Sequence, residues 1–366
     1  MPEIEGVEVR VYTVPLEAPE SDATLTWSAT TVVVAQPRAG GEVGLGFTYA
    51  TPAAGRLIED LLLPAVRGLD AMDVPRCWEA MVRAIRNMGR PGISSMAIAA
   101  LDIGLWDLKA KLLRVPLAEL LGKARAQVPV YGSGGFTSLS DRELRQQLTS
   151  WSQKLGIPRV KIKVGEAWGT REARDLERTQ LARKAVGDRV ELYVDANGGY
   201  SAKQALRLAP AYQQLGVSWF EEPVSSDHLE QLATLRAQTQ LEIAAGEYGY
   251  DLFYFERMCR AGAVDCLQAD VSRCAGITEW LRVAGLAQSH GLEISGHCAP
   301  NLHLHPACAV SNLRHVEYFA DHVRCDRVLF SGVQEPRAGF LAPDASRPGL
   351  GLELRPEAEE RYRVPI

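Results

Sequence analysis

The sequence lacks the features that mark disulfide-rich, membrane-spanning and nucleic-acid-binding proteins. Its seven cysteines are an odd number, spread from Cys77 to Cys325 without paired spacing, which argues against a disulfide framework and for a reducing compartment. There is no stretch of about 18 uncharged apolar residues, so no membrane span is expected. The chain has 40 basic and 45 acidic residues and a net charge of −5. This charge balance gives no indication of a basic surface that would bind nucleic acid.

The amino-terminal residues carry Glu3, Glu5 and Glu8 and no apolar segment, so we expect no signal peptide. These absences together predict a cytoplasmic protein with neither a nucleic-acid nor a membrane partner. What the chain does have is ordinary globular composition, with 366 residues, 46% hydrophobic and 23% charged. That is enough apolar material for a large core, and the length suits a barrel domain with a smaller domain beside it.

The first third of the chain is predicted to be α+β. Runs rich in β-branched residues cover residues 7–16, 25–36 and 41–49, and the short turns between them predict an antiparallel meander. Apolar residues at helical spacing then predict helices over residues 54–66, 75–88 and 94–113. We interpret Asp102, Asp107 and Lys109 as a polar helix face with local ion pairs.

From about residue 127 short apolar strands alternate with helix-like segments. This alternation predicts parallel strands, and eight of them predict a closed (β/α)₈ barrel. The strands are expected at residues 128–131, 160–164, 190–194, 217–220, 241–245, 264–269, 292–295 and 316–319. After about Cys325 the alternation stops, and a proline-punctuated tail is expected to return and cover the first region.

Ionisable residues stand at the carboxyl ends of the second to the eighth predicted strand. They are Lys161 and Lys163, Asp195, Glu221, Glu247, Asp270, His297 and Glu317. In barrels the carboxyl ends of the strands meet at the rim where active sites lie. A single ionisable residue after a strand is explained by a polar turn. When a whole series of them lies on one rim, their buried charges must be compensated by ion pairing or by a metal ion.

Three of these carboxylates, Asp195, Glu221 and Glu247, come from adjacent strands and would repel one another without a cation. All-oxygen ligation favours a hard cation, Mg²⁺ or Mn²⁺. The alternative is that each carboxylate forms a salt bridge with a neighbouring Lys or Arg.

Two further pairs on the rim predict proton transfer. Lys161 and Lys163 share one face of their strand, and two neighbouring ammonium groups favour loss of a proton, as a general base requires. Taken alone, the same pattern is typical of a solvated edge strand. Asp270 beside His297 predicts an acid–base dyad, and its alternative is a structural hydrogen bond.

This ordered set, with the Glu221-Glu222-Pro223 segment, resembles the enolase superfamily and, within it, the mandelate racemase subgroup. The resemblance covers nearly the whole chain. It implies an α/β fold: a modified TIM barrel of the (β/α)7-8β type with an N-terminal α+β capping domain. The implied divisions are residues 1–125 for the capping domain, 126–324 for the catalytic barrel and 325–366 for a C-terminal return that packs on the capping domain.

The resemblance also implies a role for each rim residue. One Mg²⁺, or alternatively Mn²⁺, would be held by Asp195, Glu221 and Glu247. Lys163 would be the base on one face of the substrate, with Lys161 lowering its pKa and contacting a carboxylate oxygen.

On the other face of the substrate, His297 would act as base or acid, oriented by Asp270. Glu317, if kept protonated by a raised pKa, would donate to the second carboxylate oxygen.

Members of the family with this residue set that act on acid sugars are mostly dehydratases. The resemblance therefore favours Mg-dependent removal of the proton α to a carboxylate, through an enediolate, and dehydration of an aldonate or aldarate to a 2-keto-3-deoxy acid. The alternatives are a racemase or epimerase of a 2-hydroxy acid and a non-catalytic barrel that only binds. A small-molecule carboxylate is the expected partner, and a homo-oligomer, often an octamer in this family, is also implied.

Substrate selection is expected in capping-domain loops at residues 15–27 and 49–55, which would close over the barrel mouth. Polar residues in the first loop, among them Glu20 and Asp22, favour a polar substrate. The expected substrate contacts are Trp27, Tyr49, Ser133, Asn197, Tyr248 and Arg273. His303, His315 and His322 are interpreted as structural.

Overall fold

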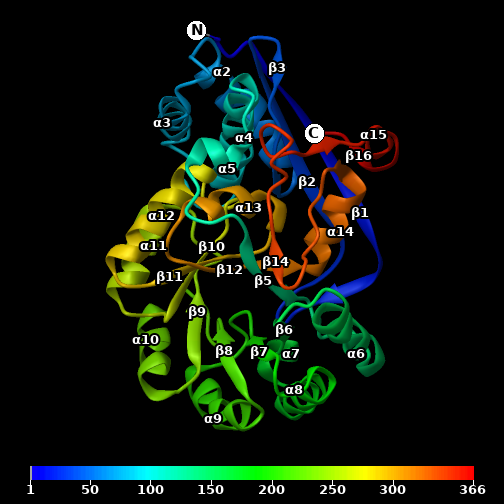
Figure 1. Ribbon diagram of the computed structural model, residues 1–366. Coiled ribbons are helices and arrows are strands. Elements are labelled where there is room, and N and C mark those ends of the chain that lie inside the picture. The colour runs from blue at the N-terminus through cyan, green and yellow to red at the C-terminus, as the bar shows by residue number, and fades with distance from the viewer. Residues whose placement is uncertain (1) are drawn as a thin grey trace.

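The computed structural model describes residues 2–366, which form an antiparallel sheet with its own helices and a larger barrel (Figure 1). The sheet has the order β16-β1-β2-β3, and β4 also pairs with β2. Its strands are β1 (Gly6–Ser21), β2 (Thr26–Ala39), β3 (Glu42–Val43), β4 (Gly46–Tyr49) and β16 (Arg363–Val364). The predicted meander is confirmed, except that its third strand is divided into β3 and β4, which both pair with β2.

Six helical segments follow β4 along the chain. They are α1 (Pro52–Leu57), the π-helical turn η1 (Ile58–Leu62), α2 (Leu63–Val66), α3 (Val74–Ala84), α4 (Ile93–Leu112) and α5 (Leu117–Leu121). Of these, α1, η1 and α4 contact the sheet. Helix α4 lies very close to β4 at Gly46. A Cβ atom at this position would lie only 2.1 Å from the carbonyl oxygen of Ala100. Any side chain at Gly46 would therefore push the helix away from the sheet.

Eight parallel strands form the closed barrel, and the pairing of the last with the first completes the ring. They are β5 (Val128–Ser133), β6 (Arg159–Lys163), β7 (Glu191–Asp195), β8 (Val217–Glu221), β9 (Glu242–Ala245), β10 (Cys266–Ala269), β11 (Glu293–Gly296) and β12 (Leu313–Phe319). All eight predicted strands are present, so the barrel prediction is confirmed.

Helical segments follow the barrel strands along the chain. They are α6 (Asp141–Thr149) with the π-helical turn η2 (Ser150–Lys154), α7 (Glu166–Gly169), α8 (Glu172–Val186), α9 (Ala202–Gln214), α10 (Leu229–Gln238), α11 (Leu252–Arg260), α12 (Ile277–Ser289), α13 (Pro300–Ala309) and α14 (Ala320–Leu329). No helix within residues 2–366 is long and apolar enough to cross a membrane.

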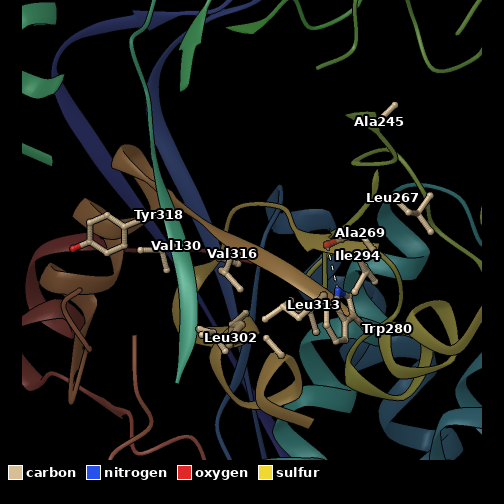
Figure 2. Packing of buried hydrophobic residues seen from close by; sticks show 14 of the residues in the cluster. Val130, Ala245, Leu267, Ala269, Trp280, Ile294, Leu302, Leu313, Val316 and Tyr318 are labelled. Atoms are coloured by element: carbon tan, nitrogen blue, oxygen red, sulfur yellow. Dashed lines mark hydrogen bonds between the residues drawn. The ribbon is translucent and has the colours of Figure 1, made fainter. Parts of the chain in front are cut away.

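Apolar side chains from strands and helices interlock outside the ring (Figure 2). Trp280 of α12 is fully buried, and its indole N–H donates to the carbonyl oxygen of Ala269 at 3.3 Å. Burying a large apolar side chain contributes roughly 1.5–3 kcal/mol. This contact holds the end of β10 one residue before Asp270, so core packing sets the position of a rim carboxylate.

The C-terminal segment returns along both regions. Strand β14 (Phe340–Leu341) pairs with β5, β13 (Phe330–Ser331) pairs with β15 (Glu353–Leu354), and α15 (Pro356–Tyr362) leads to β16, which pairs with β1. The implied division at 324/325 falls inside α14, and that at 125/126 falls between α5 and β5. We propose that the return begins after Leu329 and keep the other division as a proposal.

Two carboxylates of α4 lie in a different environment from the predicted polar face. Asp102 is fully buried and accepts hydrogen bonds from the backbone N–H of Thr278 at 3.0 Å and from its hydroxyl at 2.6 Å. Asp107 is also fully buried; it pairs with Lys111 at 2.7 Å, as a local ion pair would, but also accepts from the N–H groups of Leu45 and Leu350. The predicted local ion pair is present at Asp107 and absent at Asp102, and tertiary contacts cover this face of the helix at both positions.

Candidate active site

Strand register brings the predicted rim residues side by side. In the parallel pairing, Lys163 lies opposite Asp195, and Asp195 lies opposite Glu221. Neighbouring strands lie about 4.8 Å apart. Residues 26 and 32 positions apart in sequence therefore meet at one edge of the barrel.

The carboxylates of Asp195, Glu221 and Glu247 converge, with one ligand oxygen from each lying within 4.8 Å of the others. All three side chains are buried. The indole N–H of Trp219 donates to Glu221 at 2.9 Å, which orients that carboxylate. Oε2 of Glu247 is buried without a hydrogen-bond partner among residues 2–366. This all-oxygen donor set, with one unpartnered oxygen, fits a hard divalent cation.

The two lysines differ in how deeply they lie. Lys161 is fully buried beneath the rim and forms ion pairs with Glu221, with Glu317 at 2.7 Å and with Asp195 at 3.5 Å. Lys163 forms an ion pair with Asp195, and its side chain lines a cavity at the barrel mouth. Lysine–carboxylate pairing, the alternative to a metal site, is therefore present beside the converging carboxylates.

Lys161 lowers the pKa of Lys163, as predicted, but the net shift of this pKa is upward. Burial is the largest influence and lowers the pKa of Lys163, and Lys161 lowers it further. Asp195, Glu247 and Glu221 together outweigh both, so the pKa is raised. At Lys161 burial also lowers the pKa, and Glu221 and Glu317 outweigh it, so this pKa is held well above its usual range. The sequence pattern indicated the repulsion between the two lysines. It did not indicate that nearby carboxylates would raise the pKa of each lysine.

Asp270 and His297 form the predicted pair. Nδ1 of His297 lies 2.9 Å from Oδ2 of Asp270, while Oδ1 of Asp270 accepts from the backbone N–H and the hydroxyl of Ser272, each at 2.7 Å. Nε2 of His297 lies 3.4 Å from Oε2 of Glu247. Burial lowers the pKa of His297, but Glu247, Glu317 and Asp270 outweigh it and the pKa is raised. The ring is therefore oriented and favours the protonated form.

Glu317 differs from its predicted state. Its Oε1 lies 2.7 Å from Nζ of Lys161, and its Oε2 accepts from the backbone N–H of Cys298 at 2.8 Å. Burial raises the pKa of Glu317, but Lys161 and His297 outweigh burial and hold the pKa well below its usual range. The expectation of a protonated Glu317 is corrected, because the neighbouring cations act more strongly than the neighbouring carboxylates.

A cavity of about 180 Å³ opens above these groups, between the barrel mouth and the β1–β2 connection. Lys163, Glu247 and His297 line it. The predicted substrate-contact residues Trp27, Asn197, Tyr248 and Arg273 line it as well. The loop over residues 15–27 thus contributes to the wall, as expected.

The other two predicted contact residues lie outside the cavity wall. Tyr49 stacks on His322 with ring centroids 3.3 Å apart and donates to Asp326 at 2.6 Å, so it supports the wall from behind. Ser133 is fully buried at the end of β5.

Further wall residues were not predicted, namely Leu25, Cys298, Phe319, Asp321 and His322. His322 had been interpreted as structural. Cys298 follows β11 by two residues, and Asp321 and His322 follow the end of β12 by two and three. Extending the inspection of strand ends by three residues would have found all three.

A closed barrel that carries a carboxylate trio, a lysine and an Asp–His pair at one mouth defines an enzyme of the metal-assisted acid–base class. Residues 6–122 match the N-terminal domain of the mandelate racemase/muconate lactonizing enzyme family, and residues 143–358 match the enolase C-terminal domain-like family. The chain therefore belongs to the enolase superfamily, in its mandelate racemase subgroup.

Two curated relatives are acid-sugar dehydratases. L-talarate/galactarate dehydratase of Salmonella typhimurium is 32% identical over 97% of this chain and 90% of its own length. Arabinonate dehydratase of Saccharolobus solfataricus is 30% identical over 88% of each chain.

Solved structures agree with this assignment. A mandelate racemase/muconate lactonizing enzyme-like protein from Rubrobacter xylanophilus is 49% identical with a TM-score of 0.96, over 99% of this chain and 100% of its own. A racemase from Streptomyces coelicolor A3(2) with bound magnesium is 29% identical with a TM-score of 0.92, over 99% of this chain and 100% of its own.

Proposed function

We propose that this chain is an Mg²⁺-dependent hydro-lyase that dehydrates an acid sugar to a 2-keto-3-deoxy acid through an enediolate. The observation that carries the proposal is that Lys163 and the Asp270-oriented His297 line one cavity of about 180 Å³ beside the carboxylate trio. The two groups come from β6 and β11, well separated in the ring. A substrate carbon between them would have a proton-transfer group on each side.

Asp195, Glu221 and Glu247 are the proposed ligands of Mg²⁺, with Mn²⁺ as the alternative. The unpartnered Oε2 of Glu247 and the convergence of the three carboxylates support this assignment, as does the magnesium bound in a similar structure. When bound, the ion supplies positive charge that binds a substrate carboxylate and stabilises the negative charge that develops on it.

Lys163 is the proposed base that removes the proton next to the substrate carboxylate. It must act as the neutral amine, so the charge of Asp195, which raises the pKa of Lys163, has to be balanced by another cation. Lys161 is proposed to bind a carboxylate oxygen, and Glu317 holds Lys161 in place through their ion pair. Because its pKa is lowered, Glu317 is not proposed as a proton donor.

His297 is the proposed acid that protonates the departing β-hydroxyl. The electrons of the enediolate then expel that group as water and leave an enol, which becomes the 2-keto-3-deoxy acid. Asp270 keeps Nδ1 of His297 hydrogen-bonded, so Nε2 is the atom that faces Glu247 and the site. The raised pKa of His297 suits the acid role.

Racemisation or epimerisation of a 2-hydroxy acid is the second candidate, because it uses the same two proton-transfer groups without loss of the hydroxyl. A similar solved structure is a racemase. A non-catalytic barrel would not need the complete set of charged groups that the rim retains. The homo-oligomeric state and cytoplasmic location stay predictions.

One assay tests the proposal. A panel of sugar acids with Mg²⁺ is screened for 2-keto acid formation, and each acid is also incubated in D₂O and followed by NMR. We expect keto acid from at least one compound. Exchange of the α proton with inversion and no keto acid would establish the racemase alternative instead.

A further inference from the structure

The cap-side wall of the cavity, which we define as Asp22, Trp27, Asp321 and His322, takes no part in the proposed proton transfers. Asp22 and Trp27 come from the β1–β2 connection and the start of β2, and the other two from the first turn of α14. Contacts hold the wall together across the two regions. The hydroxyl of Thr30 on β2 donates to Asp321 at 2.5 Å.

The hydrogen-bonding atoms of this wall match hydroxyl groups. Oδ1 of Asp22 accepts from the N–H groups of Thr24 and Leu25, and its second oxygen has no partner among residues 2–366. Nδ1 of His322 accepts from the N–H of Ala299 at 3.2 Å, so a neutral ring carries its hydrogen on Nε2. Burial lowers the pKa of His322 to about 4, which keeps the ring neutral at pH 7. A hydroxyl can donate to such a carboxylate and accept from such an imidazole.

The charge of this wall is negative. Arg324 is the nearest cation to Asp321, and it is already engaged by that carboxylate at 2.7 Å and by the carbonyl oxygen of Pro15 at 2.9 Å. A third carboxyl group, Glu20, lies near Asp321 behind the wall; burial and the charge of Asp321 raise its pKa to about 8, so it is mostly protonated at pH 7 and the negative charge rests on Asp22 and Asp321.

Arg273, the arginine that lines the cavity, lies at the catalytic end. Arg273 lies 3.6 Å from Oδ2 of Asp270 and 3.6 Å from Oε1 of Glu247, and it donates to the carbonyl oxygen of Glu247 at 3.1 Å. A carboxylate at the far end of a substrate would therefore meet Asp22 and Asp321 rather than an available cation. Like charges placed together in a binding site oppose binding.

We propose that the substrate is a polyhydroxy monocarboxylate of the aldonate type, with Asp22, Asp321 and His322 selecting its neutral hydroxylated end against the second carboxylate of an aldarate. This rests on the proposed function, which places the single carboxylate at the metal end. The curated relatives include enzymes named for both kinds of acid, arabinonate and talarate/galactarate. Family membership therefore does not choose between them.

The test compares pairs of acids that differ only in oxidation of the terminal CH₂OH to a carboxylate. With Mg²⁺ present, kcat/KM for 2-keto acid formation is expected to favour the aldonate by at least about 100-fold, the scale of a like-charge repulsion. Equal or faster turnover of the aldarate overturns the inference and leaves the proposed function intact.

A binding measurement separates the inference from the proposed chemistry. Lys163→Ala is titrated with the same pairs in the presence of Mg²⁺, followed by calorimetry. Tighter binding of the aldonate supports the inference even where the wild-type enzyme makes no keto acid, a result that would instead overturn the proposed function. Equal binding of both acids, or tighter binding of the aldarate, overturns the inference.

Two variants test whether this wall causes the selectivity for the aldonate over the aldarate. Asp22→Asn keeps an oxygen that can accept from Thr24 and Leu25, so the turn is retained while the charge is lost. This variant and Asp321→Asn are each expected to narrow the aldonate/aldarate ratio by about tenfold, mainly through faster aldarate turnover. The control is Asp188→Asn, which removes the same charge from an exposed position just before β7. A ratio unchanged in both wall variants, or changed equally in the control, contradicts the assignment.

Discussion

Buried carboxylates occur in two regions of this molecule, and they are stabilised in different ways. At the contact between α4 and the rest of the chain, Asp102 and Asp107 stand apart, and each accepts hydrogen bonds from backbone N–H groups of other segments. At the barrel mouth, Asp195, Glu221 and Glu247 converge within 4.8 Å, and Oε2 of Glu247 has no hydrogen-bond partner in residues 2–366, although it lies 3.4 Å from Nε2 of His297. Burial alone is common to both regions, so it does not identify a site.

The two regions differ in the groups that compensate the negative charge of the carboxylates. Isolated carboxylates with donated N–H groups join segments together and leave no capacity for a ligand. Convergent carboxylates remain mutually repulsive until a cation is added, and protein lysines supply only part of that charge. We therefore expect variants at the mouth to change chemistry and variants at the α4 contact to change stability.

The largest expected effect is the loss of catalysis at the mouth. Lys163→Ala and His297→Asn should each reduce kcat by about 10³-fold or more, since each removes a proton-transfer group. Keto acid formation measures the loss, and circular dichroism checks the fold. Asp107→Asn is the comparison, and kcat per folded molecule should be retained. Full activity in either mouth variant would show that its assigned role is wrong.

The second largest expected effect is that of metal removal, which should affect the barrel mouth and leave the α4 contact unchanged. A chelator should abolish activity, and Mg²⁺ at 100 times its dissociation constant should stabilise the fold by about 2.7 kcal/mol. Thermal unfolding with Mg²⁺ and with chelator measures this. Glu221→Gln should lose most of the metal-dependent shift, whereas Asp102→Asn should keep it. A melting temperature unaffected by either treatment of the wild type would count against the metal site.

Removing a carboxylate from the α4 contact should lower stability while leaving the chemistry unchanged. Asp107→Ala strips an acceptor from the N–H groups of Leu45 and Leu350 and leaves Lys111 without its partner. We expect a loss of about 1–3 kcal/mol in urea unfolding. The surface variant Asp188→Ala should stay within about 0.5 kcal/mol of wild type. Equal stability of the two variants would mean that the buried bonds contribute little.

The smallest expected effect is a pH dependence at Asp102. Burial raises the pKa of this carboxyl from 3.8 to about 7, so the folded chain keeps a proton that the unfolded chain has released. The resulting stabilisation is complete below pH 3.8 and is lost as the pH rises through 7. Asp102→Asn should remove this slope, a relative change of about 1 kcal/mol between pH 6 and 7. If the stability of wild type and variant changed with pH in the same way, this assignment to Asp102 would be refuted.

Much of the candidate site could be predicted because a strand end has a definite place in a barrel. Lys163, Glu247 and His297 stand at the ends of predicted strands, and all three line one cavity. The protonation states could not be predicted in the same way. Lys161 lowers the pKa of Lys163 as expected, but the net pKa of Lys163 is raised and that of Glu317 is lowered, because a pKa depends on all the charges that lie near in space.

The cavity wall shows the same limit. Trp27 was expected there and lines it, whereas Tyr49 lies behind His322, a residue interpreted as structural. Both lie near the contact between the antiparallel sheet and α14. The local sequence pattern carries no information on how two separately formed regions meet, so it could not say which of the two rings lines the cavity.

By itself, the sequence determined the order of strands and helices, the closed barrel and the kinds of charged group at its mouth. These follow from apolar periodicity and from strand ends, which are local properties of the chain. Only the tertiary structure decided which carboxylates converge, which are satisfied by backbone N–H groups, and which residues of the cap complete the cavity. Those outcomes depend on barrel closure, strand register and the packing of the cap, which set distances between residues far apart in sequence.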